Sequence, residues 1–383
     1  MRICLYTESA FPIMGGQESV IDALARQFVA LGHEPMLLAP RPPHKLQEND
    51  SALPYPVVRH PRFVSTHRFI DWYRRYLARL HRKHRFDVLH CHSVYPTGYI
   101  ASRCAAVADI PTVITSHCGD VCPSSRLLKK PNVPSRYATA LRSADALIAI
   151  SEFVAKRYGE LCPDHARIVR IPNGVDLERF ADPLRRPAGI ENAIGPGEYF
   201  LFIGRLTHRK GVDMLLESFA SAAAENRLRL VVGGDGPQRP AMETLATSLG
   251  IQEQVHFLGQ VRDDAKTWLL RNSLCTVMPS RISEGFPLVV LESCAAGRPV
   301  IGTRIPGLRD MLESSGAGWL VSPESTTELG DALSFAADNS RLSNELGEKA
   351  RAFARNCSWA RIAALHLDLF EQLTEKRNGP VAA

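Results

Sequence analysis

The sequence has 383 residues, 45% hydrophobic and 22% charged, a composition typical of a folded protein long enough for two domains. Its longest apolar stretches, such as residues 286–291, fall far short of the roughly 20 residues that a membrane-spanning helix needs. The nine cysteines form no secreted disulfide framework, and the N-terminal apolar run is too short for a signal peptide, so we expect a cytoplasmic protein with reduced thiols.

Short β-branched segments alternate with helical segments through the first 158 residues. Such alternation is typical of parallel βαβ units in a doubly wound sheet. The expected strands are 3–7, 87–91, 112–115 and 146–150, and the expected helices are 17–31, 95–108 and 151–158.

The same pattern restarts at Tyr199, which predicts a second doubly wound domain. Its expected strands are 199–204, 229–232, 255–258 and 275–278, and its expected helices are 211–224, 237–248 and 287–296. Proline and glycine crowd residues 182–198 without apolar periodicity, which indicates a linker. We therefore expect domains at 1–181 and 182–358, followed by a helix over 359–378 whose partner the sequence leaves open.

Two glycine-containing loops follow expected strands and lead into expected helices. Backbone amides at a helix N-terminus attract phosphate, and glycine lets a bulky anion approach closely. Gly15 and Gly16 lie in the first loop, which by itself is more typical of a plain turn. The second loop adds Arg205 and Lys210, which either converge on a diphosphate or face solvent.

Two further loops carry titratable side chains at strand ends. Glu284 precedes the expected helix 287–296 and Glu292 lies within it, with an apolar run between them, so both can face a ligand at the helix mouth. His117 follows strand 112–115 and is placed to hydrogen-bond a ligand, although a lone histidine is more often structural. Cys118 and Cys122 lie nearby, but no CxxC pair supports a metal site.

In their order along the chain, these motifs resemble the family-4 retaining glycosyltransferases. The matching segments are Gly15-Gly16-Gln17-Glu18, the His117 loop, 171–176, 204–211, 234–237, and Glu284 with seven residues before Glu292. The resemblance implies an α/β GT-B fold, in which two Rossmann-like domains flank a deep interdomain cleft. The first domain would bind the acceptor, the second would bind the nucleotide-sugar donor, and the last helix would cross back to the first.

The resemblance also implies a role for each residue of the motifs. His117 would contact the donor sugar near the reacting carbon and Glu284 would hold that sugar, which makes these two the candidate catalytic residues. Arg205 and Lys210 would neutralise the diphosphate, and Glu292 would bind the ribose. The remaining donor-binding candidates are Gly15, Gly16, Asn173, Gly285, Phe286, Leu288 and Val289. Two positions depart from the family pattern, Cys118 and the loop 305–310.

The implied reaction moves a hexose from a UDP- or GDP-sugar to an acceptor with retention of configuration. We expect no cofactor and no catalytic metal, because fixed cations can balance the leaving diphosphate. The expected acceptor is a lipid-linked glycan or a polysaccharide or lipopolysaccharide precursor of the cell envelope, while a small soluble acceptor stays open. The rival interpretations are a nucleotide-sugar epimerase of the same architecture and, from the basic first half, a nucleic-acid-binding protein.

Residues 59–85 contain nine Lys and Arg but one acid, Asp71, with aromatic residues and leucines interleaved at helical spacing. Such a helix either packs as an ordinary crossover or turns a basic face to anionic lipid head groups. We favour burial of one apolar stripe, with the basic side chains facing a membrane, which predicts a peripheral location at the inner face of the cytoplasmic membrane. The candidate membrane or acceptor residues are Arg74, Arg75, Arg79, Arg82 and Lys83.

Overall fold

The computed structural model describes residues 1–43, 46, 49–62, 66–165, 167–181, 187, 190, 194, 198–223 and 228–378. The chain divides into two compact units. Unit 1 comprises Met1–Gly174 together with Trp359–Ala383, and unit 2 comprises Val175–Ser358. The division after Gly174 precedes the expected boundary after residue 181, and most of the expected linker 182–198 lies outside the described residues.

Unit 1 contains a seven-stranded parallel sheet in the order β3-β2-β1-β4-β5-β6-β7. Strand order reverses on the two sides of β1, and such a switch point is where ligands bind beyond the carboxyl ends of the strands. The strands are β1 (Arg2–Tyr6), β2 (Glu34–Pro40), β3 (Val57–His60), β4 (Val88–Cys91), β5 (Thr112–Ser116), β6 (Ala146–Ala149) and β7 (Ile168–Arg170).

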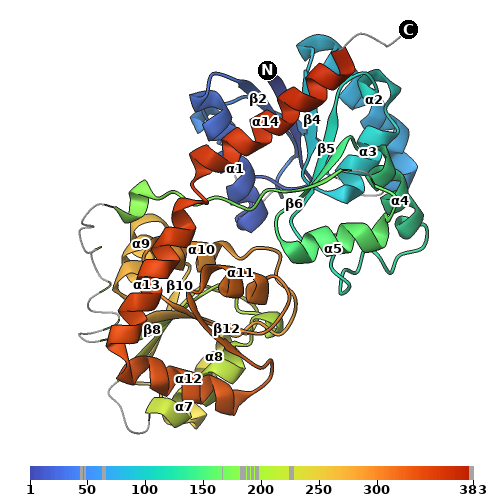
Figure 1. Cartoon of the computed structure of the whole chain (residues 1–383). Helices are drawn as coiled ribbons and strands as arrows, with labels where there is room; N and C mark the ends of the chain where they lie inside the picture. Colours follow the sequence, from blue (N-terminus) through green and yellow to red (C-terminus); the bar gives the residue numbers. More distant parts are fainter. Residues whose placement is uncertain are drawn as a thin grey trace. The chain divides into compact units, whose positions relative to one another are not determined.

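The C-terminal helix belongs to unit 1, where it lies beside α1 (Figure 1). The Phe28 ring of α1 lies 6.1 Å from the Phe370 ring and 6.4 Å from the His366 ring, centroid to centroid. The helices of unit 1 are α1 (Gly16–Ala30), α2 (Thr66–His84), α3 (Tyr99–Ser102), α4 (Val133–Ser143), α5 (Glu152–Leu161) and α14 (Trp359–Asn378), with short helical turns at η1 (Asp50–Ala52), η2 (Val94–Gly98) and η3 (Ala105–Val107).

The expected single helix over residues 95–108 is wrong. The structure has η2, which runs directly into the single turn α3, and then η3, which Arg103 and Cys104 separate from α3. Tyr95 has extended backbone angles, φ −138° and ψ 127°, because the ring of Pro96 disfavours the helical region for the residue before it. Pro96 also lacks the amide hydrogen that a helix uses.

Unit 2 contains a six-stranded parallel sheet in the order β10-β9-β8-β11-β12-β13. Its strands are β8 (Tyr199–Ile203), β9 (Arg229–Gly233), β10 (Val255–Gly259), β11 (Cys275–Met278), β12 (Val300–Thr303) and β13 (Gly318–Val321). Its helices are α7 (Val212–Ala223), α8 (Arg239–Ser248), α9 (Asp263–Asn272), α10 (Leu288–Ala295), α11 (Leu308–Ser315), α12 (Thr326–Asp338) and α13 (Ser340–Arg355), with turns at η4 (Glu178–Phe180) and η5 (His208–Lys210).

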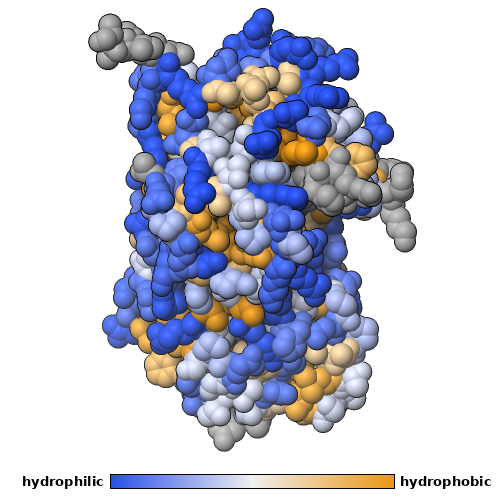
Figure 2. Space-filling view, turned by 90° about the vertical axis from the view of Figure 1, so that its right-hand side faces the viewer, coloured by the Kyte–Doolittle hydropathy of each residue, from blue (hydrophilic) through white to orange (hydrophobic). Residues whose placement is uncertain are grey.

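Apolar side chains fill both faces of each sheet, as expected for parallel strands covered by helices. Phe200, Phe202 and Phe219 form the centre of one face of unit 2. The surface in Figure 2 is mainly hydrophilic, with apolar residues in separate patches. Within the described ranges, no helix is both long enough and apolar enough to cross a bilayer.

Candidate active site

In unit 1, the carboxyl end of β5 places His117 in a loop fixed by hydrogen bonds. The Ser116 hydroxyl donates to the buried Asp120 carboxylate, which also accepts the amide hydrogen of Val94 at 2.6 Å. Cys118 has a φ of +78°, which glycine adopts at lower cost. The loop geometry therefore explains why a glycine would suit the position that this chain fills with cysteine.

The His117 ring lies against a second histidine. Its Nε2 is 3.2 Å from Nδ1 of His92, and the two ring planes lie 15° apart with centroids 5.4 Å apart. Burial, followed by the nearby His366, lowers the pKa of His117 to about 4. His117 is therefore neutral near pH 7, where its ring can both donate and accept a hydrogen bond.

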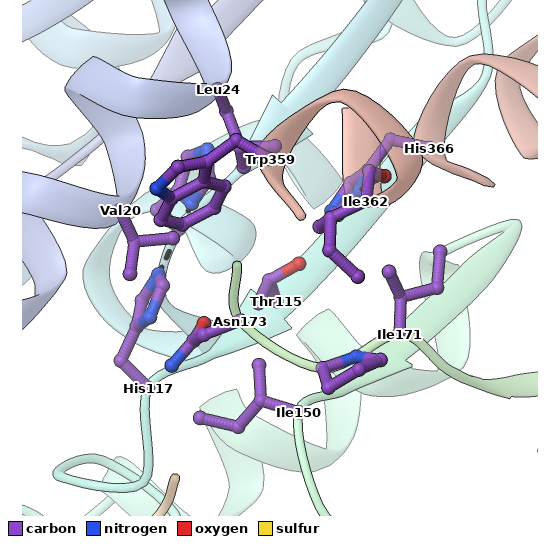
Figure 3. Close-up of a pocket in the computed structure, with 12 residues that line it drawn as sticks. Val20, Leu24, Thr115, His117, Ile150, Ile171, Asn173, Trp359, Ile362 and His366 are labelled. Atoms are coloured by element: carbon purple, nitrogen blue, oxygen red, sulfur yellow. Dashed lines mark hydrogen bonds between the residues drawn. The ribbon is translucent and has the colours of Figure 1, made fainter. Parts of the chain in front are cut away.

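Both histidines line a small pocket of unit 1, with about 10 Å³ of space for the centre of a water molecule (Figure 3). Asn173 lines the same pocket, on the segment that follows β7. A Cβ added at Gly174 would lie 2.4 Å from the Trp359 ring, so glycine lets this segment pass close to the start of α14. The structure thus brings together His117 and Asn173, two of the candidate site residues, around one pocket.

The predicted glycine pair lies at the N-terminus of α1. Gly15 is the N-cap residue in an extended conformation, and no side chain caps the helix. Gly16 is exposed at the first helical position, where amide hydrogens have no acceptor one turn earlier. A helix end of this kind can accept an anion.

In unit 2, Lys210 and Glu284 form a direct ion pair. The Lys210 Nζ lies 2.7 Å from Oε1 of Glu284, and the Ser280 hydroxyl donates to the same oxygen at 2.8 Å. Both charged side chains are mostly buried. The residues are 74 positions apart in the sequence, so the sheet brings together two separate motifs at the carboxyl ends of its strands.

Two glycines permit these loops to approach so closely. Gly211 has a φ of +65°, and a Cβ there would lie 2.1 Å from the carbonyl oxygen of Pro279. Gly307 has a φ of +82°, and its Cβ would lie 1.8 Å from the carbonyl oxygen of Glu284. The loop 305–310, which departs from the family pattern, therefore packs directly on the backbone of Glu284.

The Arg205 side chain is exposed, and no other residue in the described part of the chain forms an ion pair or hydrogen bond with it. The loop itself is well supported, since the Leu206 amide donates to Asp235 at 2.9 Å and a Cβ on Gly234 would lie 1.9 Å from the Gly204 oxygen. Arg205 is thus a cation on a fixed backbone and is available to an anionic ligand.

Glu292 lies in α10, where it pairs with a residue that the sequence did not identify. The Lys266 Nζ from α9 is 2.6 Å from Oε1 and 2.5 Å from Oε2 of Glu292. Lys266 belongs to no motif, and helix α9 was not predicted. Only the acidic first turn, Asp263 and Asp264, indicated a helix start in the sequence.

The remaining donor-binding candidates surround the N-terminus of α10. Gly285 and Phe286 lie in the loop before the helix, and Leu288 and Val289 are its first residues. Pro287 is the N-cap residue rather than the first helical residue, and Gly297 follows the helix with a φ of +68°. The first amides of α10 thus lie close in sequence to Glu284, where a phosphate or sugar oxygen can accept their hydrogens.

Unit 2 therefore offers two lysines, one available arginine and a helix N-terminus around two carboxylates. Such a set can bind a phosphorylated, hydroxyl-rich ligand, because the cations match phosphate and the carboxylates accept from hydroxyl groups. Across the described residues, the nine cysteines are free and buried, and no group of three or more His, Cys, Asp or Glu side chains is arranged to hold a metal ion.

Comparisons with known proteins identify the family of the chain. The family model described as Glycosyltransferase Family 4 matches residues 14–179, and the model described as Glycosyl transferases group 1 matches residues 190–353. A D-inositol 3-phosphate glycosyltransferase of Xylanimonas cellulosilytica is 30% identical, covering 76% of this chain and 73% of that protein. A phosphatidyl-myo-inositol mannosyltransferase of Mycolicibacterium smegmatis is 29% identical, covering 98% and 94% respectively.

Solved structures share the fold of the whole chain. Sucrose-phosphate synthase from Thermosynechococcus elongatus has a TM-score of 0.82 and 20% identity, covering 98% of this chain and 99% of that one. Anabaena HepE in complex with UDP has a TM-score of 0.82 and 17% identity, covering 97% and 100%. Both units thus have the Rossmann-like architecture of GT-B enzymes, and the chain belongs to the group 1, family-4 glycosyltransferases. The predicted fold, family and enzyme class are confirmed, which favours transfer over the epimerase interpretation.

Proposed function

We propose that this glycosyltransferase moves a hexose from a UDP- or GDP-sugar to a lipid-linked glycan or cell-envelope polysaccharide or lipopolysaccharide precursor, with retention and without a metal. The observation that carries the donor half is the Lys210–Glu284–Ser280 group beside the N-terminus of α10. HepE supports a uridine nucleotide, since that protein was solved with UDP and with UDP-glucose.

In this proposal, each part of the donor meets a matching group. Arg205 and Lys210 neutralise the diphosphate as its negative charge grows during bond cleavage, and the first amides of α10 and α1 donate hydrogen bonds. Glu284 holds the sugar hydroxyls, Glu292 holds the ribose, and His117 contacts the sugar near the reacting carbon. These cations take the role that a metal has in other transferases, so the reaction proceeds with a chelator present.

A nucleotide-binding experiment tests the donor site. Thermal unfolding is followed with UDP, GDP, ADP or CMP and their common sugar conjugates, each with a chelator. A ligand at about 100 times its Kd stabilises the folded protein by about 2.7 kcal/mol. Lys210→Met should abolish this shift, whereas Lys349→Met, an exposed lysine of α13 without an ion pair to any described residue, should preserve it. Stabilisation only with a divalent metal contradicts the proposal.

The acceptor half of the proposal rests on helix α2. Tyr73, Leu77 and Leu80 are buried, whereas the basic residues Arg75, Arg79, Arg82 and Lys83 are exposed on the opposite side. Trp72, with an exposed fraction of 41%, lies next to Arg79 around the helix, whereas Phe69, with an exposed fraction of 51%, lies on the side of the buried stripe near the start of α2. Arg74 differs from its neighbours because it is half-buried and pairs with Asp71 at 2.9 Å.

A basic helix face with exposed aromatic residues suits an anionic membrane, where a lipid-linked acceptor resides. The Mycolicibacterium relative is named for a phosphatidyl acceptor, and the Xylanimonas relative for a small inositol phosphate. We choose the lipid-linked class because of the α2 surface, and the enzyme then acts as a peripheral protein at the inner face of the cytoplasmic membrane.

Vesicle flotation tests the membrane part. Binding should require vesicles with phosphatidylserine or phosphatidylglycerol and fail with phosphatidylcholine alone. The triple variant of Arg75, Arg79 and Arg82 to Gln should lose about 3 kcal/mol of binding, at about 1 kcal/mol for each charge. Changing Arg341, Lys349 and Arg355 of unit 2 to Gln matches the charge removed and should leave binding unchanged. Equal loss in both variants contradicts a role of α2.

A further inference from the structure

Four histidines of unit 1 form a cluster, of which the proposed function uses only His117. His90 and His92 flank the end of β4, and His366 lies on α14. The His90 ring centroid is 4.1 Å from that of His92 and 5.5 Å from that of His366. His90, His92 and His366 are buried. Only His92 contacts His117 directly through a ring nitrogen.

His92 is itself held firmly by the main chain around it. Its amide donates to the carbonyl of Tyr6 at 2.8 Å, and its carbonyl accepts from the Gln17 side chain at 3.4 Å. These contacts join it to β1 and α1, the elements that present Gly15 and Gly16. The His92 ring therefore offers His117 a fixed partner, marked by the dashed line beneath Trp359 in Figure 3.

The contact with His92 decides which nitrogen of His117 is available. Nε2 of His117 faces Nδ1 of His92 at 3.2 Å, so Nε2 is used inside the protein. No described residue forms a hydrogen bond with Nδ1 of His117, and this nitrogen is not fully buried. A ligand at this end of the sheet thus meets Nδ1.

The position of the shared proton follows from the surroundings of Nε2, the ring nitrogen of His92 that does not face His117. Burial lowers the pKa of both histidines, so both rings are neutral near pH 7 and one N–H joins them. Nε2 of His92 is buried without a partner among the described residues. Buried N–H groups without an acceptor are rarer than unused acceptors. His92 therefore keeps its proton on Nδ1 and donates it, which leaves Nε2 as a bare lone pair.

We propose that His92 is a positioning residue: its Nδ1–H donates to Nε2 of His117, so that His117 carries its proton on Nδ1 and offers an N–H donor to an oxygen of the transferred sugar. The identity of the ligand rests on the proposed function, whereas the tautomer does not. A partner that fixes the tautomer and orientation of an imidazole commonly controls its chemistry.

The first measurement reads the tautomer directly in the full chain labelled with 15N-histidine, by nitrogen chemical shifts and long-range couplings to ring protons. In the unaltered protein, His117 should be protonated at Nδ1 near pH 7. In His92→Asn, the amide can still donate and the tautomer should persist. In His92→Phe, the donor is lost and His117 should shift toward the Nε2–H form. A His117 ring protonated at Nε2 in the unaltered protein overturns the proposal.

The second measurement is turnover of the donor sugar by the same variants. His92→Phe should lower kcat at least tenfold with KM changed less than threefold, and His92→Asn should recover most of the loss. His81→Phe replaces a buried histidine of α2 and should change neither kcat nor the tautomer. Unchanged kcat and tautomer in His92→Phe refute the role of His92, and the tautomer of the unaltered protein still decides if that variant fails to fold. Absence of all turnover with a correct tautomer counts against the proposed function instead.

Discussion

The Lys210 ammonium lies 2.7 Å from the Glu284 carboxylate, so two groups assigned to the donor neutralise each other before any ligand is present. A diphosphate that enters must share Lys210 with Glu284. This arrangement keeps both side chains oriented, so that Glu284 can accept hydrogen bonds from hydroxyl groups of a sugar.

Glu284→Gln should separate binding from catalysis. Glutamine keeps the shape and can accept from Ser280, but Lys210 loses its competing charge. The affinity for the nucleoside diphosphate should stay equal or increase, while kcat falls by about 10²-fold, as when one group that stabilises a transition state is removed. Calorimetric titration gives the Kd and steady-state turnover gives kcat. Parallel loss of both contradicts this division of roles.

Lys266 and Glu292 should act as one unit in donor binding. Lys266→Met leaves Glu292 without its close cation, so KM for the donor should rise about tenfold at nearly constant kcat, consistent with the loss of about 1.4 kcal/mol of binding. In a double-mutant cycle with Glu292→Gln, the two effects should not add, because the residues are in contact. Additive effects mean that Lys266 serves the donor independently.

Gly211→Ala should lower the free energy of unfolding, because it pushes the Lys210 loop away from the segment after β11. The added Cβ meets the Pro279 oxygen at 2.1 Å in a backbone with φ +65°. Gly250 supplies a matched control, because its φ is +72° but nothing lies within 4 Å of the added Cβ. Gly250→Ala should cost about 1 kcal/mol of unfolding free energy from backbone strain alone. Gly211→Ala should cost more and also weaken nucleotide binding, as measured by urea unfolding and titration.

The buried histidines should make the fold acid-sensitive. Burial lowers the pKa of His60 and His366 from 6.5 to about 4, so the unfolded chain binds protons that the folded chain excludes. The free energy of unfolding should thus fall as pH decreases from 6.5 toward 4, by at most about 1.4 kcal/mol per pH unit for each histidine, and not change through these groups above 6.5. Glu8 opposes this trend, since burial raises its pKa to about 8.

Urea unfolding between pH 5.5 and 8 measures how steeply the free energy of unfolding changes with pH. His366→Phe removes one of the groups and keeps an aromatic ring against Phe28 and Phe370, so its stability should decrease less steeply on acidification. An identical slope in the variant shows that His366 is not buried in neutral form.

The alternation of the fold was readable from the sequence because buried parallel strands are continuous apolar runs. In the strands that escaped prediction, this signal is short or interrupted. β2 begins and ends near prolines, Pro35 and Pro40, and β12 and β13 are short segments that contain glycine. Their strand conformation depends on neighbours in the sheet, which local sequence does not contain.

Candidate site residues could be singled out where they follow strands in glycine-containing loops, as Arg205, Lys210 and Glu284 do. Lys266 and His92 were not singled out as site residues, because each acts through a partner about 25 residues away. Their significance comes from pairing, and only the folded chain shows that Lys266 faces Glu292 or that a ring nitrogen of His92 meets one of His117.

The membership of α14 in unit 1 sets an order of events during synthesis. The ribosome releases all of unit 2 before the helix that covers Phe28 on α1. Unit 1 therefore keeps one apolar face exposed to solvent until α14 is synthesised, whereas all of unit 2 is already translated by then. Nascent chains stalled before residue 359 should expose that face to chaperones, so the C-terminal helix acts as the final closure of the N-terminal fold.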